Sequence, residues 1–365
     1  MKKTLIVAEI AQGHEGSFNQ CFAFIDAAKL CGADAVKFQT HIAEEESTTS
    51  ESWRKKFSFK KETRYEYWKR MEFSFDEWQQ LKNYTHKKGL YFMSTPFSEA
   101  AVELLKKVDI DFWKVGSGEV LSYNMLDKMI ASGKHIYVST GMSSWEEMDE
   151  FIGYLKKNKA QFTILQCTTA YPCDATGIGL NILSEIKKRY HCDVGFSDHS
   201  GEIFPALVAT YLGASIIEVH FTLSKFMFGP DISSSLDIEQ LKTLVQGIRF
   251  VEKMRDFPVN KDTIAKKNIK KHRLFYKRAI AKKNLEANDI IRANDFEFKK
   301  PQENGIPELE FRCCIGKKII KPIAKGGALT HNHFVSEDCG IIQKQLKILK
   351  KEYTKCAIKK EKFVL

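Results

Sequence analysis

Eight short apolar segments, each followed by a longer stretch with helical spacing, constrain the fold of this chain more than any other feature. The segments span residues 4–11, 33–39, 90–95, 111–117, 135–140, 162–167, 193–198 and 215–221. Between them, apolar residues recur at helical intervals, as at Phe22, Ile25 and Ala28. This alternation is typical of β/α units on a parallel sheet. Eight units in about 250 residues predict an α/β fold, a closed (β/α)8 TIM barrel.

An open doubly wound sheet is the main alternative, but no Gly-x-Gly-x-x-Gly sequence follows the first strand. The 365 residues exceed the usual size of one domain, so a second, smaller domain is expected. We predict the barrel at residues 1–255, a basic linker at 256–274, a small β-rich module at 275–336 and a basic tail at 337–365. The tail has helical spacing at Leu346, Leu349 and Tyr353.

The net charge of +11 comes from the linker and the tail. Residues 261–283 hold ten Lys or Arg against one Asp, and residues 343–365 hold eight Lys against two Glu. Neither segment interleaves the aromatic residues of a base-stacking surface, so no nucleic acid partner is expected. No apolar run approaches a membrane span or signal peptide, and the nine cysteines show no CxxC pair. We therefore expect no membrane partner, reduced thiols and a cytoplasmic location.

Polar side chains stand at the end of nearly every predicted strand. In a barrel these ends share one face, so the side chains are expected to converge on one cavity. A single cluster could be accidental, but eight of them favour an enzyme. The groups are Glu9, Lys37 with Gln39, Ser94 with Thr95, Lys114 with Ser117 and Glu119, Ser139 with Thr140, Cys167 with Thr168, Ser197 with Asp198 and His199, and His220.

Lys37 and Lys114 end the second and fourth strands. Burying two ammonium groups side by side is costly unless an anion is bound, and a phosphate–carboxylate ligand would supply that charge. Hydroxyls at Thr95, Ser117, Ser139 and Ser197 add donors that suit phosphate oxygens. The alternative for either lysine is a structural side chain at the barrel rim.

His199 and His220 end the seventh and eighth strands, which are neighbours in a barrel. Their imidazoles, with an oxygen from Glu9, Glu119 or Asp231, would suit a divalent ion such as Mn or Mg. A single histidine is more often structural than a metal ligand. Glu9 is the strongest candidate for proton transfer, because it interrupts an apolar strand and is costly to bury without a role.

The residues resemble the sialic acid synthases (N-acetylneuraminate synthases) and their legionaminic and pseudaminic acid relatives. The resemblance covers the predicted barrel almost completely. It extends into an antifreeze-like, or SAF, module. The matching runs are AEIAQGHEGS (8–17), GADAVKFQTH (32–41), STPFSEAA (94–101), WKVGSGE (113–119), VSTGM (138–142), QCTTAYP (166–172), GFSDHS (195–200), IIEVHFTLS (216–224), GPDISSSLD (229–237), FKKPQENGIP (298–307) and GKKIIKPIAKGGALTHNHF (316–334).

This resemblance implies that C3 of phosphoenolpyruvate attacks the open-chain aldehyde of N-acetylmannosamine or a similar sugar, with loss of phosphate. It assigns three sets of residues. The phosphoenolpyruvate contacts are Lys37, Thr95, Lys114, Ser117, Ser139 and Ser197. The metal ligands are His199 and His220, the latter also close to the chemistry, and the sugar contacts and acid or base groups are Glu9, Gln39, Glu119, Tyr171 and Asp231. We expect Glu9 to organise the water that attacks C2.

Three departures from the family pattern concern the substrates. Thr169 stands where many relatives carry Asn or Ser beside phosphoenolpyruvate. Lys300 stands where the module of relatives places an Arg into the partner's active site, and Lys keeps the charge but not the bidentate fork. Residues 46–75 do not align closely with the sugar-binding loop. The resemblance also implies a homodimer in which the module completes the partner's site.

Two other functions remain open from the sequence. One is an aldolase in which Lys37 or Lys114 forms a Schiff base with a keto acid. The other is a non-catalytic carbohydrate- or anion-binding protein in which the C-terminal module does the binding.

Overall fold

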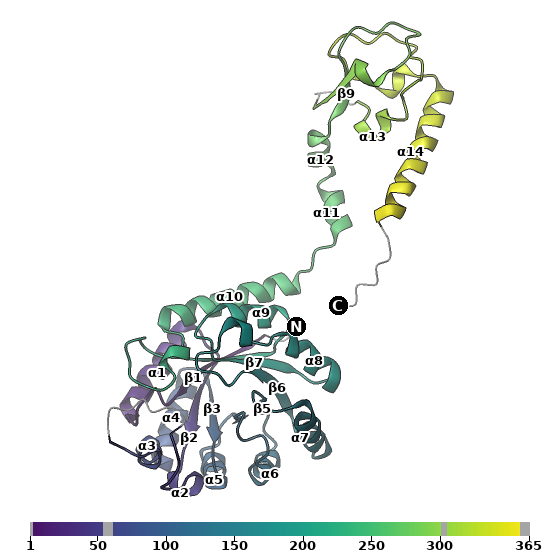
Figure 1. Ribbon diagram of the computed structural model, residues 1–365. Coiled ribbons are helices and arrows are strands. Elements are labelled where there is room, and N and C mark those ends of the chain that lie inside the picture. Colours follow the sequence, from purple (N-terminus) through teal and green to yellow (C-terminus); the bar gives the residue numbers. More distant parts are fainter. Residues whose placement is uncertain (1–2, 54–60, 301–304, 358–365) are drawn as a thin grey trace. The chain divides into compact units, whose positions relative to one another are not determined.

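The computed structural model describes residues 3–53, 61–300 and 305–357 and contains two compact units, Met1–Pro258 and Val259–Leu365. The first unit is a closed barrel of eight parallel strands in sequence order (Figure 1). The strands are β1 (Leu5–Ala11), β2 (Ala35–Thr40), β3 (Tyr91–Pro96), β4 (Phe112–Val115), β5 (Ile136–Ser139), β6 (Phe162–Cys167), β7 (Val194–Asp198) and β8 (Ile216–His220). The predicted fold is confirmed, and each predicted strand overlaps one of these eight.

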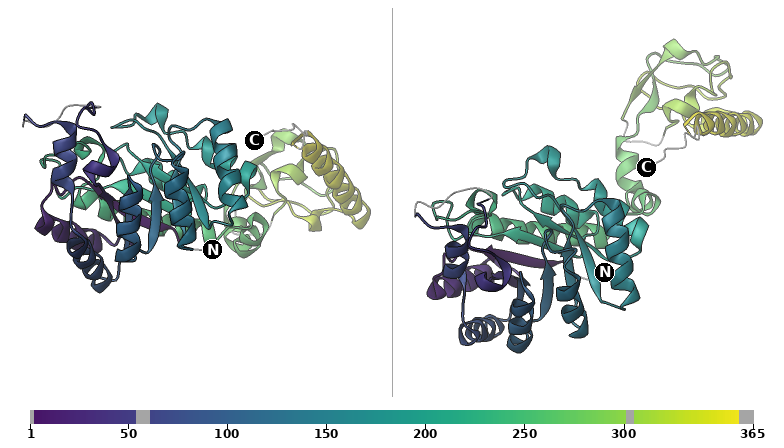
Figure 2. Two further views of the ribbon diagram at one scale, coloured as in Figure 1. Left: turned by 90° about the horizontal axis from the view of Figure 1, so that it is seen from below. Right: turned by 60° about the horizontal axis from the view of Figure 1, so that its bottom comes forward.

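Helices surround the strands on the outside of the barrel, which both views of Figure 2 show. Those between successive strands cover the sheet, and α10 after β8 packs against α1 and α9. They are α1 (Phe18–Cys31), α2 (Ala43–Glu46), α3 (Arg64–Met71), α4 (Phe75–Lys87), α5 (Glu99–Val108), α6 (Tyr123–Ala131), α7 (Trp145–Lys157), α8 (Asn181–Tyr190), α9 (Phe204–Tyr211) and α10 (Ile238–Asp256).

Local sequence explains where several of these helices begin. Capping boxes start α4 at Ser74 and α7 at Ser144, where the hydroxyl and a glutamate three residues later satisfy free backbone N–H groups. Asp237 and Gln240 do the same for α10. Helix α1 ends at Gly32, whose φ of 85° favours glycine over other residues.

The interior of the barrel contains an apolar layer. Val7, Ala35, Met93, Leu165 and Ile216 form one buried cluster contributed by five strands. On β7 the position beside this layer is Gly195, and a Cβ on Gly195 would lie 2.3 Å from Ile216 Cγ2. The layer is therefore filled without room for another methyl group. It closes the barrel beneath the side chains that follow along each strand.

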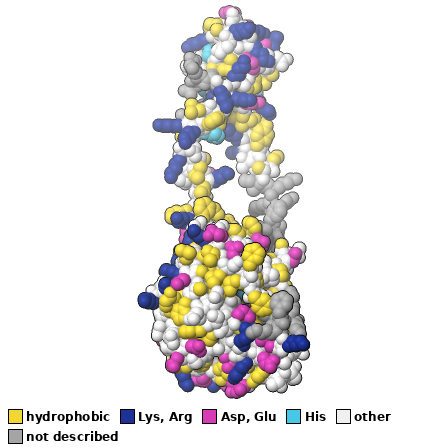
Figure 3. Space-filling model, turned by 90° about the vertical axis from the view of Figure 1, so that its left-hand side faces the viewer, with side chains coloured by type: hydrophobic (Ala, Val, Ile, Leu, Met, Phe, Trp, Pro, Cys, Tyr) yellow, Lys and Arg dark blue, Asp and Glu magenta, His cyan; other side chains and the backbone are white. Residues whose placement is uncertain are grey.

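The second unit contains a small antiparallel sheet and several short helices. Strand β9 (Arg278–Ala281) pairs with β10 (Phe296–Lys299), over a core that includes Phe311, Leu329 and Ile342. The helices of this unit are α11 (Lys261–Lys267), α12 (Ile269–Phe275), α13 (Glu308–Phe311) and α14 (Ser336–Ala357). Lys and Arg side chains are numerous on the face of this unit that Figure 3 shows.

The segment predicted as a linker contains the end of α10 together with α11 and most of α12, so much of it is helical. The helix predicted in the tail is present as α14. Among the residues that the structure describes, no helix combines the length and the apolar character needed to cross a membrane.

Candidate active site

Charged side chains occupy the inward positions directly above the apolar layer. Side chains alternate along a strand, so the residue two positions after an inward residue also points inward. Glu9 follows Val7 in this way, Lys37 follows Ala35, and Glu218 follows Ile216. Lys114 on β4 completes the set. Strand register places Glu9 beside both Lys37 and His220.

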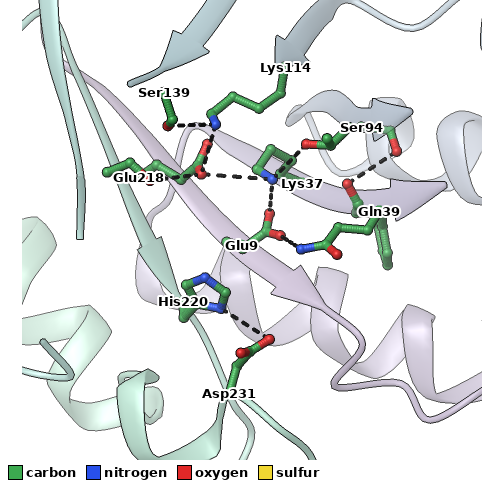
Figure 4. A network of polar contacts seen from close by, with 12 residues as sticks. Glu9, Lys37, Gln39, Ser94, Lys114, Ser139, Glu218, His220 and Asp231 are labelled. Carbon is green, nitrogen blue, oxygen red and sulfur yellow. Dashed lines mark hydrogen bonds and ion pairs between the residues drawn. The ribbon is translucent and has the colours of Figure 1, made fainter. Parts of the chain in front are cut away.

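These four side chains form one buried ionic network (Figure 4). Lys37 Nζ lies 2.6 Å from Glu9 Oε2 and 3.8 Å from Glu218 Oε1. Lys114 Nζ lies 3.7 Å from the same Glu218 oxygen. No member is more than 4% exposed. Breaking such a pair costs more than breaking a surface pair, because the remaining charge stays buried.

Burial shifts the pKa of all four groups, and the neighbouring charges decide the direction. Burial raises the pKa of Glu9 and lowers that of Lys114. Burial alone would raise the pKa of Glu218, but Lys114 and Lys37 lower it below the ordinary value. Burial alone would lower the pKa of Lys37, but Glu218 and Glu9 raise it. Glu9 is therefore the carboxyl group in this network that takes up a proton most readily.

Three of the predicted hydroxyl groups contact this network. Lys37 Nζ donates to Thr95 Oγ1 at 3.1 Å, and Lys114 Nζ donates to Ser139 Oγ at 2.8 Å. Ser197 Oγ donates to Glu218 Oε1 at 3.1 Å. The charged layer thus presents ammonium groups and hydroxyls together, which are the donors that an oxyanion requires.

Ser117 and Thr169 lie together beside Gly141. The backbone N–H of Gly141 donates to Ser117 Oγ at 3.0 Å. A Cβ on this glycine would lie 2.8 Å from Thr169 Oγ1 and 3.1 Å from Ser117 Oγ. The Thr169 hydroxyl is buried and has no hydrogen-bond partner among the described residues. It is therefore a polar group that a ligand atom could satisfy.

The two predicted metal ligands lie next to each other, with ring centroids of His199 and His220 5.1 Å apart. Nδ1 of His199 lies 2.8 Å from the Thr168 carbonyl and so donates to it, which leaves Nε2 with a lone pair. The Tyr171 hydroxyl lies 3.1 Å from that Nε2, and its ring stacks on the imidazole. Burial lowers the pKa of His199 and keeps the ring neutral, as a metal ligand must be.

Asp231 Oδ2 lies 3.8 Å from His220 Nδ1, so a carboxylate accompanies the two imidazoles. Within the described ranges, no group of three His, Cys, Asp or Glu side chains converges closely enough to hold a metal ion. The chemistry of two adjacent imidazoles fits a divalent transition metal ion, but a complete coordination sphere would need further ligands, such as substrate or water.

Two further predicted site residues, Glu119 and Lys300, take part in none of the contacts described above. Glu119 is half-buried and accepts a hydrogen bond from Ser122 Oγ at 3.0 Å, and burial raises its pKa. Lys300 belongs to the second unit, where its side chain is exposed and its Nζ lies 4.9 Å from the ring centre of Phe275. The other site residues predicted from the sequence lie at the strand ends or in the loops that follow them.

Glu218 is the functional residue that the sequence analysis missed. It joins the two lysines, so the protein itself supplies part of the anionic charge that we had expected from a ligand. The sequence did contain a signal. Glu218 interrupts an apolar strand in the same way as Glu9, and it lies two residues before His220 on the same inward face.

Replacing Glu218 by Gln tests the network as a source of stability. We expect Glu218→Gln to lower the free energy of unfolding at pH 7 by about 3 kcal/mol, because two buried ammonium groups lose a shared carboxylate. The folded-state pKa of Glu218 lies below the ordinary 4.5, so its contribution is present above pH 4.5 and is lost as the pH falls through the folded-state value. The difference in the free energy of unfolding between Glu218→Gln and the unmodified chain should therefore become smaller below pH 4.5.

Urea unfolding followed by tryptophan fluorescence measures this, since all five tryptophans belong to the barrel unit. Glu202→Gln is the matched control, because Glu202 is exposed. If Glu218→Gln were as stable as Glu202→Gln at pH 7, the network would contribute no stability.

Comparisons with known proteins identify the family. Residues 24–259 match the model of the NeuB family. The chain is 33% identical to N,N'-diacetyllegionaminic acid synthase of Campylobacter jejuni, over 88% of this chain and 97% of the relative. It is 30% identical to human N-acetylneuraminate-9-phosphate synthase, over 86% of this chain and 88% of the relative.

A solved structure agrees with these matches. The N-acetylneuraminic acid (sialic acid) synthetase of Leptospira borgpetersenii, solved with citrate, superposes with a TM-score of 0.66 and 27% identity, covering 75% of this chain and 93% of that one. The resemblance to this family is confirmed for the barrel, and the antifreeze-like module stays a prediction. With its matched barrel, its ionic network and its paired imidazoles at one set of strand ends, this chain belongs to the NeuB family.

Proposed function

We propose that this chain condenses phosphoenolpyruvate with the open-chain aldehyde of N-acetylmannosamine or a related N-acyl amino sugar. The products are a nine-carbon 2-keto sugar acid and inorganic phosphate. The observation that carries the proposal is the position of Lys37 and Lys114 in one buried network, close in the barrel to the neighbouring imidazoles of His199 and His220. Membership of the NeuB family and the names of the relatives support it.

The ionic network suits phosphoenolpyruvate, which carries a carboxylate and a phosphate. Lys37 and Lys114 would hold its charged oxygens, with Thr95, Ser139 and Ser197 as additional donors. Because the lysines already contact Glu9 and Glu218, an incoming anion would have to displace a carboxylate from a lysine. Glu9 is the carboxylate whose pKa burial raises, so once displaced from Lys37 it would be the stronger base of the two.

The reaction requires two bonds to form. C3 of phosphoenolpyruvate attacks the sugar aldehyde carbon, and the aldehyde oxygen takes a proton. Water then adds at C2, and the C2–O bond to phosphate breaks as the keto group forms. Glu9, whose pKa burial raises, would organise and deprotonate that water. Gln39, Tyr171 and Asp231 would contact the sugar, and Glu119 would serve as a second acid or base.

We further propose that the reaction depends on a divalent ion, Mn or Mg, held by His199 and His220. When bound, such an ion supplies Lewis acidity to the aldehyde oxygen. The protein's part is to hold both rings in position. The Thr168 carbonyl orients His199 through Nδ1, and Asp231 lies against Nδ1 of His220.

The Schiff-base aldolase is the second candidate, and one observation favours it. Burial lowers the pKa of Lys114, which makes its amine a better nucleophile. Its short contacts to Ser139 and Glu218 instead favour a role as a charged donor. Trapping of a keto acid on Lys37 or Lys114 by borohydride, without added metal, would support the aldolase.

The function can be tested by measuring phosphate release from phosphoenolpyruvate with a panel of N-acylated hexosamines and Mn or Mg. We expect one phosphate per product, only when both a suitable sugar and the ion are present, and a product whose mass equals the sum of the sugar and pyruvate. His199→Ala should lower the rate at least a hundredfold, since ligand and orienting groups act together.

His191→Asn is the matched control, because His191 is an exposed histidine in the left-handed conformation that asparagine tolerates. Phosphate release that needs no sugar, or full activity of His199→Ala, would contradict the proposal.

We also propose that the second unit is an antifreeze-like module that completes the active site of a partner subunit in a homodimer, with Lys300 as its contact to the sugar. The exposed position of Lys300 and the resemblance of residues 298–307 and 316–334 support this. The cytoplasmic location stays a prediction.

Variants of Lys300 test its proposed contact with the sugar, and mixed dimers test the proposed homodimer. Lys300→Met should lower kcat/KM for the sugar about tenfold, as expected for one lost charged contact. Lys318→Met, at another exposed lysine of this unit, should have little effect.

Mixed dimers of Lys300→Met and His199→Ala chains, formed by co-expression, should regain activity because one site contains neither change. Mixtures no more active than the sum of the two variants, or a fully active monomer, would rule this arrangement out.

A further inference from the structure

A continuous chain of hydrogen bonds leads from Glu9 away from the ionic network to His41 and Glu46. Gln39 Nε2 donates to Glu9 Oε1 at 3.0 Å, and Gln12 Nε2 donates to Gln39 Oε1. The same Gln12 nitrogen lies 3.0 Å from His41 Nε2. His41 Nδ1 lies 2.7 Å from Glu46 Oε1. These five residues are called the His41 chain below.

The imidazole of His41 is held firmly in its plane. It stacks between Trp68, at 4.1 Å and 14° between the planes, and Phe97, at 4.5 Å and 7°. The residue is only 4% exposed. Its side chain can therefore neither tilt nor turn away without opening an aromatic stack. Only the two ring nitrogens, at the edge of the ring, contact polar groups.

The order of donors and acceptors follows from the ionised Glu9 end. A carboxylate only accepts, so the amide nitrogen of Gln39 must face Glu9 and its oxygen must face Gln12. Gln12 then presents its nitrogen to Gln39. Because that same nitrogen also faces His41 Nε2, the ring must accept there and carry its proton on Nδ1. The carboxylate of Glu46 accepts a hydrogen bond from this Nδ1–H group. Every contact in the His41 chain is therefore satisfied in one arrangement only.

We propose that His41 is a positioning residue that fixes the carboxylate of Glu9 through Gln12 and Gln39. This inference rests on the proposed function, in which Glu9 acts on the water that attacks C2. Glu9 Oε2 is held by Lys37, and Oε1 is held by the His41 chain. When phosphoenolpyruvate engages Lys37, the His41 chain becomes the main restraint on the orientation of Glu9.

Glu46 connects this restraint to a second carboxylate of the site. Burial raises the pKa of Glu119, and the charge of Glu46 adds to this shift. Glu46 also accepts from the backbone N–H of Ile42 with its other oxygen. The His41 chain therefore begins at an anchored carboxylate and ends at Glu9.

The kinetic test compares His41→Phe with His41→Gln in the full chain. Phe keeps the aromatic stack but loses the acceptor, so kcat should fall ten- to hundredfold, as expected for a slightly misplaced catalytic group, while KM for both substrates stays within about twofold. Gln offers an oxygen near the position of Nε2 and should recover most of the loss. Gln12→Leu should add little to His41→Phe, because both break the same chain.

A wild-type kcat in His41→Phe, an equal loss in His41→Gln, or additive losses with Gln12→Leu would overturn the inference. Thermal unfolding of each variant shows whether the fold is intact.

The second measurement needs no catalysis and uses the unmodified chain. Long-range ¹H–¹⁵N NMR of the histidine side chains, with the His41 signal assigned by its loss in His41→Phe, should show a neutral ring with its proton on Nδ1. A proton on Nε2, or a charged ring, would contradict the proposed order of donors and acceptors. If no sugar supports phosphate release by the unmodified chain, the proposed function fails. The NMR measurement still shows which ring nitrogen of His41 carries the proton.

Discussion

Two lysines and two glutamates buried together above the barrel core determine what this protein can do. Lys37 and Lys114 could not remain charged in that position alone, and Glu218 lies between them as a shared counterion. Glu9 adds a second carboxylate, whose pKa burial raises. The network is thus stable without ligand, yet it contains a carboxylate that an incoming anion can displace from Lys37. That combination favours a site for a strongly anionic substrate over a purely structural ion cluster.

Strand alternation produces this site at low cost to the fold. One inward layer, including Val7, Leu165 and Ile216, closes the barrel with apolar contacts. The next inward layer carries the charges, and the loops beyond it bring His199 beside His220. The apolar layer keeps water from the lower side of the ionic network. The loops that follow the strands can change in sequence without disturbing either layer. Differences among relatives in the sugar they use are therefore expected in segments outside the barrel strands, such as residues 46–53 and 61–75, and the ionic layer should change least.

The sequence was sufficient for the scaffold and for most of the site, because both follow from periodic patterns. Eight apolar segments predicted eight strands, and strand-end residues such as Lys37 and His220 met at one mouth. Glu218 was missed because the prediction for β8 considered only its last residue, His220. The His41 chain depends on contacts between side chains that follow different strands, such as Gln12 after β1 and Glu46 in α2, which no local pattern specifies. The predicted linker was largely helical, since its basic residues are also good helix formers.

The central claim is that the paired lysines bind phosphoenolpyruvate, and a crystal structure of the chain with this ligand tests it most directly. The account predicts ligand oxygens within about 3 Å of Nζ of both Lys37 and Lys114, the distance of a charge-assisted hydrogen bond. It also predicts that Glu9 remains bonded to Gln39. Phosphoenolpyruvate bound elsewhere, with both lysines still contacting only protein groups, would contradict the account.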